Sequence, residues 1–144
     1  MVERQRVDRD LNLFRRGKRS PKYYTYDDGA PTLFTFVIQA RDKDTEELSC
    51  DVCVLTTPEK AIFLIERFVL FELRNADVLD LDLESFHDKI EATDTKEANP
   101  AHAVIVGLKF CEDADPSNEC YLKSAALARS SWRVWVDGER ELQK

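Results

Sequence analysis

The chain has 144 residues and a formal net charge of −7, with 43% hydrophobic and 34% charged residues. A chain of this length fits one domain whose hydrophobic core is large enough to fold without disulfides or a structural metal. It contains four glycines and neither a GxGxxG nor a GxxxxGKS/T pattern, which argues against a glycine-rich phosphate-binding loop.

Charge is distributed unevenly along the chain. Residues 1–22 hold eight Lys/Arg against three Asp/Glu, a charge of +5, whereas the remaining 122 residues hold 13 against 25, a charge of −12. This asymmetry predicts a basic N-terminal arm at 1–22 and a single acidic domain at 23–144. The arm could bind an anionic partner, including nucleic acid through residues 4–22, or it could fold back on its own acidic body.

The N-terminus is polar and lacks the apolar stretch of a secretory signal. The longest apolar run, residues 61–73, is interrupted by charged residues and is shorter than the about 20 residues of a membrane span. We therefore expect a cytoplasmic protein that does not enter a membrane and whose four cysteines stay reduced.

Two strands are expected after the arm. Residues 32–41 (TLFTFVIQAR) carry apolar side chains on both alternating faces, which is typical of a central strand. Residues 46–56 alternate instead, with Leu48, Cys50, Val52 and Val54 on the inward side.

The strongest helical signal lies at residues 58–74. Thr57 can act as the N-cap, Pro58 suits the first helical position and Glu59 suits the positive end of a helix. Ten of the 13 residues at 61–73 are apolar, and most of them share one broad face of a helical wheel. We expect one long helix here, with the rest of the domain packed around it.

Residues 78–86 (VLDLDLESF) alternate leucine with acidic residues, which predicts a strand with one solvated face. Residues 101–110 are continuously apolar and predict a second central strand. The Asp-Pro pair at 115–116 resembles a helix start, so a helix is expected at 116–130, with a hairpin strand from Cys120 as the alternative. A strand at 131–136 closes the domain.

These elements define an α+β fold class. We expect one antiparallel or mixed sheet with the long helix at 58–74 and the C-terminal helix at 116–130 packed on it.

A candidate partner-binding stripe lies on the more charged side of the predicted long helix. Phe63, Arg67, Leu70 and Arg74 repeat there at i, i+4, i+7 and i+11. Apolar residues between arginines resemble the composition of interface cores. The alternative is that this side packs internally, beneath the N-terminal arm.

Asp80, Asp82 and Glu84 fall on one face of the predicted strand, each about 6.6 Å from the next. They could form a solvated face, a surface for a basic partner, or part of a metal-dependent hydrolase site. A divalent cation needs oxygens within about 2.0–2.6 Å of one point, which one strand cannot provide. We therefore predict neither a metal site nor a cofactor.

The basic residues near the N-terminus precede a tyrosine-rich segment, and basic and aromatic side chains together can bind nucleic acid. No RNP, KH or helix-turn-helix pattern accompanies them. The candidate nucleic-acid-binding residues are Arg15, Arg16, Lys18, Arg19 and Lys22.

Cys50 and Cys53 form a CxxC pair, a spacing found in zinc and redox sites. Within a strand the two side chains point to opposite faces, and Cα atoms about 10 Å apart exceed the ~7 Å limit for a disulfide. Structural cysteines are therefore expected. His87 and His102 have no neighbouring Ser or Cys in a relay arrangement, so no catalytic residue is predicted.

Taken together, these patterns favour a non-enzymatic protein–protein interaction module. It would be a subunit of a hetero-complex or homo-oligomer, or an inhibitor or adaptor that binds a basic partner. The alternatives are a nucleic-acid-associated subunit that uses the basic arm and a small metal-dependent hydrolase.

Overall fold

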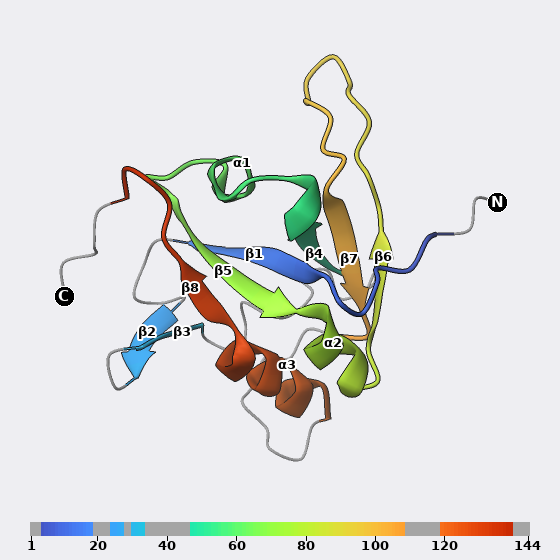
Figure 1. Ribbon diagram of the computed structural model, residues 1–144, viewed down its shortest axis with the longest axis vertical. Helices are drawn as coiled ribbons and strands as arrows, with labels where there is room; N and C mark the ends of the chain where they lie inside the picture. Colours follow the sequence, from blue (N-terminus) through green and yellow to red (C-terminus); the bar gives the residue numbers. More distant parts are fainter. Residues whose placement is uncertain (1–3, 19–23, 28–29, 34–46, 109–118, 140–144) are drawn as a thin grey trace.

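The computed structural model describes residues 4–18, 24–27, 30–33, 47–108 and 119–139 (Figure 1). Its elements, in chain order, are β1 (Asn12–Lys18), β2 (Tyr24–Asp27), β3 (Ala30–Leu33), β4 (Glu47–Val52), a 3-10 turn (Cys53–Leu55), α1 (Pro58–Ile62), β5 (Phe68–Arg74), α2 (Asn75–Asp80), β6 (Glu84–His87), β7 (His102–Val106), α3 (Glu119–Ser130) and β8 (Trp132–Val134).

Six of the strands form one sheet in the order β6-β7-β4-β1-β5-β8. All pairings between these strands are antiparallel. β2 and β3 pair with each other as a separate antiparallel hairpin. Together with the three helices, this arrangement confirms the α+β class.

β1 lies inside the sheet, with β4 on one side and β5 on the other. Leu13 is paired with both Val52 and Leu73 and is fully buried. The separate basic arm predicted at 1–22 is therefore not confirmed, because residues 12–18 of it form an interior strand. The run of basic residues concealed this strand, which carries only two large buried apolar side chains, Leu13 and Phe14.

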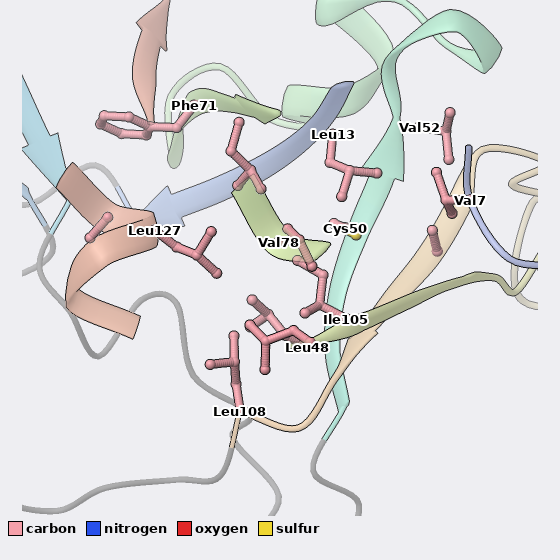
Figure 2. Packing of buried hydrophobic residues seen from close by; sticks show 14 of the residues in the cluster. Val7, Leu13, Leu48, Cys50, Val52, Phe71, Val78, Ile105, Leu108 and Leu127 are labelled. Atoms are coloured by element: carbon pink, nitrogen blue, oxygen red, sulfur yellow. The ribbon is translucent and has the colours of Figure 1, made fainter. Parts of the chain in front are cut away.

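The two faces of the sheet bury different clusters, because successive side chains of a strand point to opposite faces. α2 and α3 cover one face, where Leu48, Val78 and Ile105 gather with Leu127 of α3 (Figure 2). The helix α1 covers the other face, where Ala61 and Ile62 pack in a smaller cluster with Phe14, Leu70 and Val136.

The long helix predicted at 58–74 is wrong beyond its first five residues. Its start is as expected, because Pro58 opens α1 and the Thr57 hydroxyl accepts a hydrogen bond from the backbone N–H of Lys60. The helix ends at Ile62, and residues 68–74 form β5 between β1 and β8. A strand buried on both faces reads as a continuous apolar run, which periodicity alone cannot distinguish from a buried helix.

The strand predicted at 78–86 is also wrong in its first half, which forms the end of α2. The backbone N–H groups of Leu83 and Asp82 bond to the carbonyls of Val78 and Leu79, and Asp82 has a φ of 59°. This is a Schellman cap, accompanied by packing of Leu83 near Val78 in one cluster. The apolar residues that pack around this cap, Val78, Leu81 and Leu83, are separated by acidic residues in the sequence, and this spacing resembled the alternation of a strand.

The remaining elements follow the sequence more closely. β4 buries Leu48, Cys50 and Val52 as expected, but the inward position predicted for Val54 is wrong, because the strand ends at Val52 and Val54 lies exposed in the 3-10 turn. β7 and β8 lie within the strands predicted at 101–110 and 131–136. α3 confirms the C-terminal helix over Glu119–Ser130, so the alternative hairpin strand from Cys120 is wrong. Most of the strand predicted at 32–41 lies outside the described residues.

Asn75, the first residue of α2, ties the N-terminal segment to the domain. It is completely buried, and its side-chain amide donates to the carbonyls of Val7 and Asp8, both at 3.0 Å. The hydroxyl of Ser85 donates to its side-chain oxygen at 2.7 Å. Three polar groups of the core thus depend on one side chain.

Candidate interaction surface

The chain between β4 and β5, residues 53–67, covers the sheet face opposite α2 and α3 (Figure 1). The buried side chains of Ala61 and Ile62 attach α1 to the sheet. The rest of this covering segment is unusually apolar on its outer side, because it carries four of the seven large exposed hydrophobic side chains of the described residues. These four are Val54, Leu55, Phe63 and Leu64.

Phe63 ends α1 in a conformation that L-residues rarely adopt. Its φ and ψ are 67° and −64°, and the backbone N–H of Leu64 donates to the carbonyl of Ile62 at 2.8 Å. These values describe a γ-turn of the strained, positive-φ kind. A non-glycine residue in such a conformation costs about 1–3 kcal/mol. The turn nevertheless leaves the Phe63 side chain 66% exposed.

The guanidinium of Arg16, on β1, stacks on the rings of Phe63 and Phe68. Its central carbon lies 5.5 Å and 5.0 Å from the two ring centroids, within range of a cation–π contact. Packing of the surrounding chain lowers the pKa of Arg16, and the charge of Asp51 offsets part of this effect. We call Arg16, Phe63, Leu64 and Phe68 the Phe63 surface.

The structure does not bring the predicted stripe together. Phe63 and Arg67 are exposed, but Leu70 lies on β5 with 0% exposure, packed with Phe14 and Ile62. Leu70 is therefore a core residue and not a contact residue, because β5 turns it toward α1 instead of solvent. Arg74 is exposed at the end of β5 and pairs with Asp77 at 3.4 Å.

The three acidic candidates lie on different elements. Asp80 ends α2, Asp82 lies in the following turn and Glu84 begins β6. Asp80 and Glu84 form ion pairs with Arg9 at 2.9 Å and Arg6 at 3.6 Å. The described start of the N-terminal segment thus folds back on the acidic body. Both ion pairs are exposed, so each contributes little to stability.

Three of the five basic candidates lie on β1, and the other two lie outside the residues that the structure describes. Arg15 donates to the carbonyl oxygen of Ser49 at 2.9 Å, and Arg16 stacks on Phe63. Lys18 is exposed at the end of β1. Arg19 and Lys22 lie outside the described residues.

Cysteine and histidine residues form no reactive arrangement within the described residues. Cys50 and Cys53 belong to the clusters on opposite faces of the sheet, as their spacing predicted. Burial raises the pKa of Cys50 to about 12, and burial together with the charge of Glu72 raises that of Cys53. His102 donates through Nδ1 to the carbonyl of Asp88 at 2.8 Å. No group of metal-ligating side chains occurs in the part of the chain that the structure describes.

A buried ion pair between β8 and the chain that follows it was not foreseen from the sequence. The side chains of Arg133 and Glu139 are 3% and 1% exposed, and their charged groups lie 3.0 Å apart. Arg133 also donates to the carbonyl of Leu70 and stacks at 4.3 Å on Trp135. This pair fixes the chain after β8 against β5, next to the cluster under α1. Two charged residues six positions apart gave no signal of burial.

Comparison with protein-family models, curated proteins and solved structures finds no significant match for this chain. Among the helices described here, none has the length and apolar content needed to cross a membrane.

Proposed function

We propose that this protein is a non-enzymatic protein–protein interaction module that binds its partner through the Phe63 surface. The observation that carries the proposal is the conformation of Phe63. A strained backbone and an exposed aromatic ring are both unfavourable for the chain alone. Such strain is typical of binding and switch sites, and a partner that covers the ring would give it a role.

The composition around Phe63 supports the proposal. Interface cores and hot spots are enriched in aromatic residues and arginine, and here Arg16 stands between two phenylalanine rings. Leu64 and, on the same covering segment, Val54 and Leu55 add exposed apolar area. The partner is another chain, either in a hetero-complex or as a second copy of this protein.

The acidic residues remain a predicted second surface for a basic partner, but the proposal does not rest on them. Asp80 and Glu84 already have arginine partners in their own chain. Asp82 alone is too small a feature to define a binding surface.

The proposal is tested with Phe63→Asp and a matched control, Leu122→Asp. Leu122 is also an exposed apolar residue, 49% exposed, but it lies on α3. Both proteins are used as bait in extracts of cells that produce this protein, and their masses in solution are measured by light scattering. We expect Phe63→Asp to lose a partner or an oligomer that Leu122→Asp retains. Equal behaviour of the two variants, at unchanged thermal stability, would refute the proposal.

A further inference from the structure

Arg16 is the cation of the Phe63 surface, and its N–H donors have no described acceptor. A guanidinium carries five N–H donors, yet that of Arg16 forms neither a hydrogen bond nor an ion pair with any residue that the structure describes. Among the described residues, the guanidinium contacts the two phenylalanine rings. Its donors, at the edge of the guanidinium, have no acceptor among the described residues, and a ligand with a carboxylate would supply one.

Most other described arginines, unlike Arg16, form an ion pair with a carboxylate. Arg4, Arg6, Arg9, Arg74 and Arg133 each have a carboxylate partner within the chain. In a protein with 28 Asp/Glu and a net charge of −7, such partners are abundant. An arginine on a central strand whose side chain lies over two aromatic rings, with no described carboxylate bonded to it and with Asp51 acting on it only through its charge, is therefore a specific feature of this surface.

The charges of the covering segment balance one another and leave Arg16 without an ion-pair partner there. Glu59 and Glu66 are exposed there together with Lys60 and Arg67, and none of the four forms an ion pair within the described residues. Their charges balance, so the charged groups that remain beside the rings are the guanidinium of Arg16 and the carboxylate of Asp51, which acts on it without a hydrogen bond. A binding partner would meet one fixed cation beside exposed apolar side chains.

We propose that the Phe63 surface binds a protein segment in which an aspartate or glutamate adjoins an apolar residue. The carboxylate accepts two hydrogen bonds from the Arg16 guanidinium, a geometry that Arg and carboxylate groups share. The apolar residue packs on the exposed ring of Phe63 and on Leu64. This inference rests on the proposed function and specifies the chemistry of the partner.

Nucleic acid could also use an arginine beside an aromatic ring. The net charge of −7 opposes it, because a polyanion approaching this chain meets long-range repulsion along its whole length. A short peptide with one or two carboxylates meets far less repulsion. The balance of charge therefore favours an acidic and apolar peptide.

The test uses a phage-displayed library of random dodecapeptides, panned on the full-length protein. The best peptides are synthesised in two forms, one with their acidic residues and one with Asn or Gln in those positions. Binding is measured for the wild type and for Arg16→Gln, Arg16→Lys, Phe63→Ala and Arg129→Gln. Arg129 is an exposed cation of α3 and is the matched control.

We expect peptides that combine carboxylates with apolar residues, and about tenfold weaker binding for the neutral peptides and for Arg16→Gln. Arg16→Lys should recover only part of the loss, since it restores charge without the planar fork, whereas Arg129→Gln should bind like the wild type. Thermal unfolding of each variant separates a binding defect from a folding defect.

Three outcomes would overturn the inference. These are the absence of selected peptides, selected peptides whose binding does not depend on Arg16, and tighter Arg16-dependent binding of single-stranded poly(U) RNA than of any peptide. If binding depends on Phe63 but not on Arg16, this inference fails while the proposed function stands. If binding depends on neither residue, both fail.

Discussion

Replacing Phe63 by alanine and, separately, by glycine distinguishes the effect of the side chain from that of the backbone. Both variants remove the exposed ring and its contact with Arg16. Only glycine adopts a φ of 67° without steric cost. The difference in free energy of unfolding between the two variants therefore reports the strain of the γ-turn.

The expected difference follows from two opposing effects. Alanine keeps a backbone strain of about 1–3 kcal/mol at this conformation. Glycine avoids it but gains about 0.4–1 kcal/mol of conformational freedom in the unfolded chain, which lowers stability. Phe63→Gly should therefore be about 1 kcal/mol more stable than Phe63→Ala. For a chain of this size, that difference raises Tm by about 3 °C.

Urea unfolding monitored by tryptophan fluorescence measures this difference, since Trp132 and Trp135 lie on and directly after β8. Leu122 in α3 provides the control, because glycine in a helix is about 1 kcal/mol less stable than alanine. The sign of the Gly-minus-Ala difference should thus be opposite at the two sites. A Phe63→Gly variant less stable than Phe63→Ala would show that the turn is not strained and would remove the main support for the proposed function.

Three further predictions concern the interior. Asn75→Leu should lower the free energy of unfolding by about 2–4 kcal/mol, because it leaves two carbonyls and the Ser85 hydroxyl unpaired; a urea-measured loss below 1 kcal/mol would contradict this. In a double-mutant cycle, Arg133→Met and Glu139→Gln should show a coupling energy well above the roughly 0.5 kcal/mol typical of surface pairs. Glu139→Gln alone should lower the free energy of unfolding by about 3 kcal/mol, because it leaves the buried charge of Arg133 unpaired. Burial raises the pKa of Cys50 from 9.0 to about 12 in the folded protein, so the folded state keeps the thiol proton to a higher pH than the unfolded state does. The free energy of unfolding should therefore fall as pH rises from 9 toward 12. Cys50→Ala should flatten that fall, and an unchanged slope would count against the burial of the thiol.

Local signals in the sequence predicted the elements whose boundaries depend on local chemistry. The Thr57–Pro58 helix start is correct because capping involves only the next three residues. The inward residues of the predicted strand are correct as far as Val52, because one polar face made the alternation visible, but not at Val54, where the strand has already ended. β5 was mistaken for helix because its identity depends on β1 and β8, which pair with it from both ends of the chain. No local pattern contains that information.

The candidate surface was predicted in part for the same reason. Phe63 stood out in the sequence as an apolar residue among charged ones, and it is exposed. Leu70 was grouped with it only because a helix was assumed, and the change from helix to strand moves Leu70 into the core. The contact of Phe63 with Arg16 joins residues that are far apart in the chain. It could not be predicted without the sheet register that places β1 beside β5.

The position of β1 also explains the charge asymmetry of the sequence. Arg6 and Arg9, before β1, pair with Glu84 and Asp80 on the acidic body, so part of the excess of +5 is neutralised within the chain. Arg16 is held on the opposite sheet face from α2 and α3, over two rings, where no described carboxylate is bonded to it, although the charge of Asp51 acts on it. Because a rigid interior strand fixes its position, it can present its donors in one orientation before a partner arrives, which reduces the entropy lost on binding. The basic segment thus combines two roles, since its first arginines attach it to the domain and Arg16 carries the proposed recognition.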